Sequence, residues 1–332
     1  MTRSVPQPTS EPTPPQASQH RPPTQWAVII NLSPDSFSGD GAGHPGSQRD
    51  AVACRLESLV HAPVDWIDVG AVSTRPGSHP VTVDEEWRRL SAAMEAIVAF
   101  RKRRHAMGRP VCISLDTSSP LNALRAASQG CVDIINDVWG GRKREDGLST
   151  IDVAAQWGCG LILMHMQGEP GTMQTQPKYN NCIDEVTSFL SAQWSRARAA
   201  GVSQIYVDPG IGFGKTLQHN LSLLSPEGLR SLCGIARSRF EIPKIVIGLS
   251  RKRFLLDLAF GLEAEHGQHV DHREHVVSDN DLRIPANRDY ATKVWEQRCI
   301  DRFESLDKDG LPSVLVVRTH RLPHEVTGTL RH

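Results

Sequence analysis

Eight short apolar runs, separated mostly by segments of helical character, constrain this chain more than any other feature of its sequence. The runs lie at residues 26–30, 64–69, 111–115, 132–135, 160–164, 205–207, 244–249 and 313–317. They are continuous rather than alternating, which is typical of parallel strands buried on both faces. Eight such units predict an α/β protein with a (β/α)8 TIM barrel, and the alternative is an open doubly wound sheet. No GxGxxG motif follows a run, so a dinucleotide site is not indicated.

Helices are expected between most of the runs. They are predicted at 49–61, 84–104, from 120 onward, 149–157, 182–200, 220–239 and 288–303. Asp84 is a suitable N-cap for the second helix, and Pro120 suits a first helical position. After the last run, Pro323, Gly328 and the short remaining length disfavour a full helix. We therefore expect the last helix of the barrel to be short or missing.

The composition divides the chain into a tail and one large domain. Residues 1–24 carry seven prolines among Ser, Thr and Gln, and such a segment buries too little apolar surface to order itself. We predict a disordered tail at 1–24 and a barrel domain at 25–332, with a polar insert at about 261–287. Histidines recur every third residue in that insert, from His266 to His275. An exposed loop is favoured there over a metal site, because no fixed cysteine or carboxylate set accompanies them.

Charge and cysteine content exclude several classes of protein. Lys+Arg and Asp+Glu both number 37, and the zero net charge disfavours binding of nucleic acid in bulk. No apolar run approaches the length of a membrane helix. The seven cysteines are scattered and form no CxxC pair. They predict reduced thiols in a cytoplasmic protein rather than a zinc site.

Polar residues at the ends of the runs are the candidate functional residues, because the carboxyl ends of barrel strands meet at one mouth. They are Asn31, Thr74, Arg75, Asp116, Asn136, Asp208, Lys252, Arg318 and His320. One subset, Asp116, Asn136 and Asp208, suits a flat heterocycle with N–H donors. The rest of the set includes arginines, which match phosphate oxygens in a bidentate way. No nucleophilic dyad or triad stands out, which favours catalysis by positioning and by charge stabilisation of a leaving group.

Single members of this pattern also have ordinary structural interpretations. Asn136 could cap a turn, and Asp208, in the sequence Val207-Asp-Pro-Gly210, could simply end a strand. Lys215 could cap a helix, pair with Asp208 or contact a ligand. His165 could brace a loop or the barrel floor, and we do not count it among the catalytic candidates.

Seven motifs in order resemble the dihydropteroate synthase family. They are NLSPDSFS at 31–38, STRPG at 73–77, Asp116-Thr117, IND at 135–137, LMHMQG at 163–168, DPGIGFGK at 208–215 and SRK at 250–252. The resemblance covers about 26–255 and resumes at Arg318-Thr-His320. It implies a transferase of folate biosynthesis that condenses 6-hydroxymethyl-7,8-dihydropterin pyrophosphate with para-aminobenzoate. The products would be 7,8-dihydropteroate and pyrophosphate, and the pyrophosphate would leave early from a cation-like pterin.

The resemblance also implies a role for each candidate. The pterin would be held by Asp116, Asn136, Asp208 and Lys252, with Arg318 against its face. Pyrophosphate would be bound by Arg75, Arg318 and His320. Asn31 would ligate Mg²⁺ through the diphosphate. The aminobenzoate pocket would be shaped by Phe37, Thr74, Pro76 and Phe213. The catalytic set would be Arg75, Lys252, Arg318 and His320, in a homodimer with small-molecule substrates, no nucleic acid and no membrane.

Two departures from the family keep other functions open. Arg321 stands where the family usually has Asp, and the final helix that normally follows is not predicted. These changes motivate a non-catalytic pterin-binding homologue as the alternative to an active synthase. A related methyltransferase that passes a methyl group to a corrinoid would share the central pterin set. It would have no evident need for the STRPG and SRK motifs.

Overall fold

The strands form a closed parallel barrel, and they follow one another around it in the order of the sequence. The computed structural model describes residues 24–32, 48–72, 81–235, 242, 244–252, 254–255, 285–308 and 313–326. Eight parallel strands form one closed sheet in chain order, which excludes the doubly wound alternative. They are β1 (Thr24–Asn31), β2 (Trp66–Gly70), β3 (Cys112–Asp116), β4 (Ile134–Asp137), β5 (Gly160–Met164), β6 (Ile205–Asp208), β7 (Lys244–Gly248) and β8 (Val314–Thr319).

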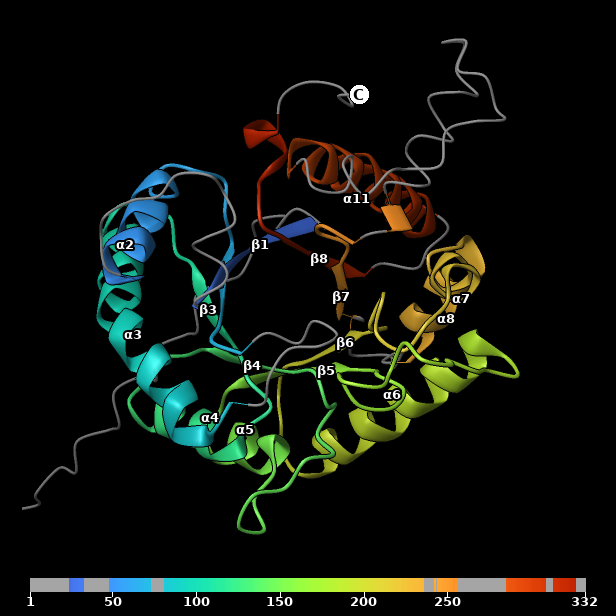
Figure 1. The fold of residues 1–332 in the computed structure, drawn as a ribbon, viewed down its shortest axis with the longest axis horizontal. Coiled ribbons are helices and arrows are strands. Elements are labelled where there is room, and N and C mark those ends of the chain that lie inside the picture. Colours follow the sequence, from blue (N-terminus) through green and yellow to red (C-terminus); the bar gives the residue numbers. More distant parts are fainter. Residues whose placement is uncertain are drawn as a thin grey trace, which may run out of the picture.

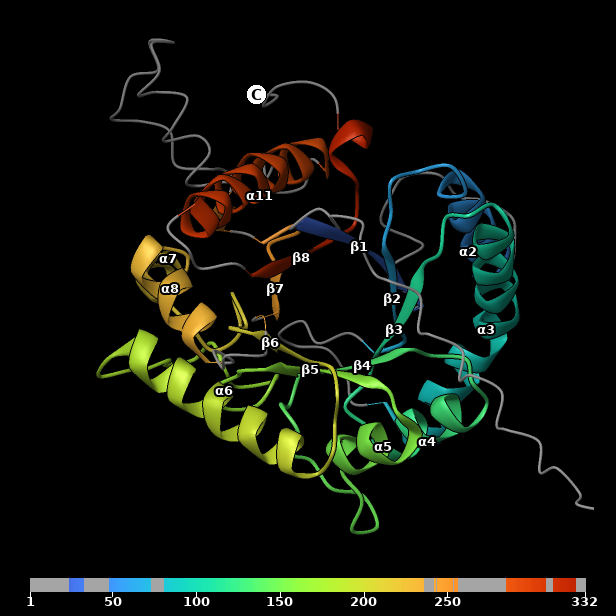
Figure 2. The same cartoon turned by 180° about the vertical axis from the view of Figure 1, so that it is seen from behind.

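Helices surround this barrel as an outer ring (Figures 1 and 2). They are α2 (Gln48–Ser58), α3 (Val83–Ala106), α4 (Pro120–Ser128), α5 (Thr150–Trp157), α6 (Cys182–Ala199), α7 (Leu217–Leu223), α8 (Pro226–Gly234) and α11 (Pro285–Lys308). Each described strand except the last is followed by at least one helix before the next strand. Within the described residues no helix combines the length and apolarity needed to cross a membrane.

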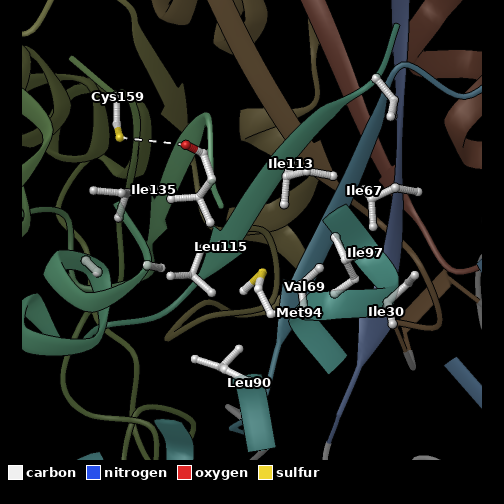
Figure 3. Packing of buried hydrophobic residues seen from close by; sticks show 14 of the residues in the cluster. Ile30, Ile67, Val69, Leu90, Met94, Ile97, Ile113, Leu115, Ile135 and Cys159 are labelled. Atoms are coloured by element: carbon white, nitrogen blue, oxygen red, sulfur yellow. Dashed lines mark hydrogen bonds between the residues drawn. The ribbon is translucent and has the colours of Figure 1, made fainter. Parts of the chain in front are cut away.

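The two faces of each strand pack against different partners. Outward-facing side chains such as Ile67, Val69 and Leu115 meet the inner face of α3, including Leu90 and Met94 (Figure 3). Inward-facing side chains form a separate cluster inside the barrel, made of Ala27, Trp66, Ile134, Ile162, Tyr206, Val246 and Val316. Because side chains alternate along a strand, the next inward positions lie nearer the carboxyl ends. Four of these seven positions are polar, namely Asp68, Asn136, Asp208 and Arg318, so the apolar floor of the barrel supports a largely polar mouth.

Three local expectations from the sequence need correction. Thr82, not Asp84, is the N-cap of α3, because its side chain accepts from the backbone N–H of Glu85 at 3.2 Å. The predicted single helix over 220–239 is wrong, since α7 ends at Leu223 and α8 begins at Pro226. Ser225 is extended and caps the second helix, as expected for a residue that precedes proline. Thr24, expected in the tail, already belongs to β1.

No full helix follows β8 in the described residues, as expected. The chain instead forms one 3-10 turn, η1 (Pro323–Glu325). Leu322, fully buried, joins the core cluster that contains Val52 and Leu56 of α2. Trp26 of β1 is half-buried and packs against two core clusters, the one that contains Leu322 and the one that contains Trp295 of α11. Several predictions fall outside the described residues. They concern the tail at 1–23, the insert up to 284, and the site residues Phe37, Thr74, Arg75 and Pro76.

Candidate functional site

A buried ion-pair network lies in the centre of the barrel mouth. Arg318, at the end of β8, donates from Nε to Asp68 Oδ2 at 2.9 Å and from Nη2 to the same oxygen. Its Nη2 also donates to Asp116 Oδ2 at 2.9 Å. Asp68 lies in β2, is 1% exposed, and also accepts from Ser114 Oγ at 2.6 Å and Asn136 Nδ2 at 3.3 Å. One guanidinium is therefore shared by two carboxylates.

The register of the sheet explains why these residues meet. Gly70 pairs with Asp116, and Asp116 pairs with Asn136, so the ends of β2, β3 and β4 are level. Gly70 leaves little room at this level, since a Cβ there would lie 3.2 Å from the Cβ of Asp116. The side chains of Asp116 and Asn136 consequently share one interior layer, directly above the layer of Asp68.

Burial disfavours the charged form of the carboxylates in the mouth. Together with the charge of Asp68, it raises the pKa of Asp116 to about 7, against the lowering effect of Arg318. Burial also raises the pKa of Asp208, which is 2% exposed and accepts from the N–H of Gly210 at 2.7 Å. Burial alone would lower the pKa of Arg318, but the charges of Asp68 and Asp116 outweigh it, and that pKa is raised. The mouth thus holds three carboxylates, of which Asp116 and Asp208 have raised pKa values, and it suits a ligand rich in N–H donors.

A second group of side chains forms the rim between β1, β7 and β8. Asn31 Nδ2 lies 3.2 Å from His320 Nε2, and Ser250 Oγ lies 2.8 Å from His320 Nδ1. Because an amide nitrogen only donates, Nε2 accepts, and Nδ1 carries the ring proton toward Ser250. The backbone N–H of His320 also donates to Ser250 Oγ, at 3.1 Å. Asn31 and His320 are therefore held in one hydrogen-bonded chain beside the mouth.

The Ser250–Lys252 loop is fixed from behind by α11. Arg251, at φ 59°, donates from Nε to Asp289 Oδ1 at 2.9 Å, and its backbone N–H donates to Thr292 Oγ1 at 2.9 Å. The next residue, Lys252, places its Nζ 4.2 Å from the ring centroid of Phe213. This distance is that of a cation–π contact. The outer helix thereby sets the positions of both Ser250 and Lys252.

The loop after β6 is packed tightly against the loop after β5. Gly210 has a φ of 66°, and a Cβ on it would lie 1.9 Å from the carbonyl oxygen of His165. Lys215 reaches the same carbonyl at 3.4 Å, and its Nζ lies 3.0 Å from His165 Nδ1 and 3.1 Å from the Phe213 carbonyl. Of the structural interpretations of His165, the loop brace is the one observed. Lys215 contacts His165 and Phe213 rather than pairing with Asp208.

Burial is the main influence on the pKa values of Lys215 and His165. It lowers the pKa of Lys215, 3% exposed, to about 7. It also lowers the pKa of His165 to about 3, with the neighbouring charge of Lys215 adding to the effect. A neutral imidazole and a readily deprotonated amine can share a hydrogen bond without two buried charges facing each other.

Comparison with known proteins decides the family. A family model described as pterin binding enzyme matches residues 27–301. The dihydropteroate synthase of Neisseria meningitidis serogroup B is 36% identical over 283 residues, which cover 81% of this chain and 90% of that protein. The chain belongs to the dihydropteroate synthase family. The Escherichia coli K12 synthase is 39% identical over 230 residues, covering 68% of this chain and 73% of its own length.

Solved structures of dihydropteroate synthases share the fold. The Xanthomonas albilineans enzyme, solved with 4-aminobenzoic acid, gives a TM-score of 0.66 at 29% identity and covers 91% of this chain and 89% of its own. The Thermus thermophilus enzyme, in complex with 4-aminobenzoate, gives 0.63 at 30% identity, with 91% and 90% covered. The predicted TIM barrel and the predicted synthase family are both confirmed.

The described members of the predicted site fall into three sets in this dihydropteroate synthase barrel. Asp116, Asn136, Asp208 and Arg318 lie in or beside the central network, and Asn31 and His320 lie at the rim. Lys252 and Phe213 contact each other. Phe37, Thr74, Arg75 and Pro76 are outside the described residues.

Sequence reasoning missed Asp68, the carboxylate that holds Arg318. The signal was present, because Asp68 stands inside an otherwise apolar run, Trp66-Ile-Asp-Val-Gly70. A carboxylate at an inward position of a buried strand needs a cationic partner. Asp137, in contrast, lies in the IND motif but has a structural role. It accepts from Trp139 N, Gly141 N and Thr150 Oγ1 and shapes the loop after β4.

Proposed function

We propose that this chain catalyses the dihydropteroate synthase reaction: para-aminobenzoate and 6-hydroxymethyl-7,8-dihydropterin pyrophosphate give 7,8-dihydropteroate and pyrophosphate. The observation that carries the proposal is the central network, in which Asp68 and Asp116 share one guanidinium. Asp208 is a third buried carboxylate, and the charge of Arg318 partly offsets the rise that burial causes in its pKa. A pterin offers ring and exocyclic N–H donors to these carboxylates, and its desolvation is thereby offset.

The deep set binds and orients the pterin in this proposal. Asp116, Asn136 and Asp208 accept from or donate to its polar edges, and Lys252 contributes a cation beside Phe213. Arg318 now lies across the carboxylates that the heterocycle needs. It moves to the pterin face when the substrate enters, where a guanidinium stacks on an aromatic ring. Asp68 remains as its anchor.

The rim set stabilises the leaving group. The amine nitrogen of aminobenzoate forms a bond to the pterin methylene carbon while the carbon–oxygen bond to pyrophosphate breaks. The electron pair goes to the pyrophosphate oxygen, and the amine proton goes to solvent. Arg318 and His320, with Arg75 as expected from the sequence, stabilise the charge that develops on that oxygen. Phe213, with Phe37, Thr74 and Pro76, forms the aminobenzoate pocket.

The rim also suits Mg²⁺, which we include in the proposal. The amide nitrogen of Asn31 is committed to His320, so its oxygen is the atom that suits a hard cation. Among the described residues no group of three or more His, Cys, Asp or Glu could hold a metal. The ion would take its other ligands from diphosphate oxygens and water, as Mg²⁺ commonly does. When bound, it would neutralise charge on the diphosphate.

Cellular location and assembly complete the proposal. All seven cysteines are free thiols, which supports a reducing, cytoplasmic compartment. A homodimer remains a proposal from family resemblance, and light scattering on the purified chain would measure it.

The experiment is pyrophosphate release by the purified chain with pterin pyrophosphate, para-aminobenzoate and Mg²⁺, omitting each component in turn. Release that depends on both substrates and on Mg²⁺ is expected. If nothing is released while pterin pyrophosphate still binds by calorimetry, the chain is the non-catalytic homologue. Release that is unchanged without Mg²⁺ would contradict only the metal part of the proposal.

A further inference from the structure

The segment after β8 occupies the place where a barrel helix would begin. Residues 320–326 run from the mouth to α2 and form η1, at the red end of the trace beside α11 in Figure 1. We name these residues the C-terminal strap. Leu322 is fully buried in the core cluster that includes Val52 and Leu56 of α2. The strap therefore links a rim residue, His320, to an outer helix by a short and direct path.

Arg55 of α2 holds both ends of the strap. Its Nη1 donates to Glu325 Oε1 at 2.5 Å and its Nη2 to Glu325 Oε2 at 3.0 Å, which is the bidentate fork. The same Nη2 donates to the carbonyl oxygen of His320 at 2.9 Å. Glu325 Oε2 also accepts from the backbone N–H of Leu322 at 2.7 Å. The side chains of Arg55 and Glu325 are 26% and 17% exposed, so solvent screens this pair only partly.

Two other side-chain contacts of the strap are longer or more exposed. Arg321 approaches Asp289 at 3.8 Å, with its side chain 44% exposed. Lys293 Nζ donates to the carbonyl of Val326 at 3.3 Å in an exposed position. Long, exposed contacts of this kind contribute little to order. Arg55, together with Ser250 and the buried Leu322, thus fixes the strap where it leaves the rim.

The backbone N–H and the backbone carbonyl of His320 are both hydrogen-bonded, each to a different side chain. Its N–H donates to Ser250 Oγ, and its carbonyl accepts from Arg55. With both fixed, the Cα–Cβ direction is set, and the ring reaches Asn31 and Ser250. If the carbonyl were released, the backbone of His320 would lose its attachment to α2, and the direction of the ring would be less well defined.

We propose that Arg55 is a positioning residue for the pyrophosphate site, acting through the carbonyl of His320. Within the described residues the strap, rather than a helix, connects the rim to the outer layer. The inference rests on the proposed function, because it assumes that His320 faces the pyrophosphate. Of the deep pterin set, Asp116, Asn136 and Asp208 lie at the ends of β3, β4 and β6, whereas Arg55 acts on the segment after β8.

Calorimetry on the full chain tests the inference with two probes, inorganic pyrophosphate with Mg²⁺ and 6-hydroxymethyl-7,8-dihydropterin. Arg55→Met is expected to weaken pyrophosphate binding about tenfold, the effect of one lost charged contact. Binding of the pterin should stay within about twofold of the parent. Arg55→Lys keeps one donor and should recover part of the loss. The matched control is Arg49→Met, on the same helix, where Arg49 pairs with the exposed Glu95 at 2.7 Å.

The outcomes separate this inference from the proposed function. Unchanged pyrophosphate affinity in Arg55→Met, with weakened affinity in His320→Ala, would overturn the role of Arg55 and leave the proposed function intact. Unchanged affinity in His320→Ala would instead remove His320 from the pyrophosphate site, which would overturn this inference and the role of His320 in the proposed function. Equal weakening of both probes in Arg55→Met and Arg55→Lys would indicate general damage and also overturn the positioning role.

Discussion

Replacing Asp68 by Asn tests the central ion-pair network, because it removes one charge and almost no volume. Asp68 accepts from Arg318, Ser114 and Asn136 and is 1% exposed. An asparagine keeps one oxygen but presents an N–H₂ group where a second acceptor stood. At least one buried donor therefore loses its partner.

The expected loss of unfolding free energy depends on which partners Arg318 keeps in the variant. Removing one partner of a buried ion pair costs about 3–5 kcal/mol when the other charge is left alone. Arg318 is not left alone, since Asp116 Oδ2 stays 2.9 Å from its Nη2. The loss then approaches that of one hydrogen bond to a charged group, about 1.5–3 kcal/mol. We expect Asp68→Asn to lower the free energy of unfolding by about 2–3 kcal/mol at neutral pH.

Urea denaturation of the parent and the variant measures this change. The matched control is Glu95→Gln, which removes the carboxylate from the exposed pair with Arg49, where the side chain of Glu95 is 78% exposed. A pair of this kind contributes about 0.2–1 kcal/mol. A loss in Asp68→Asn no larger than in Glu95→Gln would refute the reasoning. Arg318 would then not depend on Asp68 for its place in the mouth.

Two further predictions concern the loops of the mouth. Gly210→Ala should destabilise the chain by several times the roughly 1 kcal/mol expected for Gly158→Ala in thermal unfolding. Both glycines have positive φ, but only at Gly210 would a Cβ meet a carbonyl oxygen, and equal losses would contradict this packing. Lys215→Met should flatten the rise in unfolding free energy between pH 7 and 10. Burial lowers the pKa of Lys215 to about 7, so the unfolded chain binds more protons in that range and stability increases with pH. Urea denaturation at three pH values checks this, and parallel curves for parent and variant would refute it.

The sequence was most informative where an apolar run ends in a polar residue. Asp116, Asn136 and Arg318 were predicted at the mouth for this reason, and all three lie there. The rule depends only on parallel strands whose carboxyl ends meet, so it needs no knowledge of distant contacts. Asp68 escaped the rule because it lies one inward position below the strand end, where the run continues past it.

Other features were beyond local reasoning. Arg55 is an ordinary helix residue in the sequence, and its partners His320 and Glu325 follow more than 260 positions later. No periodicity or spacing indicates such a contact. The break at Pro226 could have been found, because a proline after Ser225 ends one helix and starts another. The helical pattern over 220–239 predicts one helix, but the backbone chemistry of proline overrides it.

Closure of the barrel by β1 and β8 has a consequence for how the chain is made. Thr24 pairs with Leu315, so the first strand finds its second neighbour only when the last strand exists. During synthesis one edge of β1 stays unpaired until β8 has been made. Pairing between strands so far apart in the sequence gives a high contact order, which slows folding. Exposed edges recruit other chains, so this interval is when aggregation and chaperone binding would compete with folding. A chain that stopped before β8 would keep two unpaired strand edges permanently, one on β1 and one on β7.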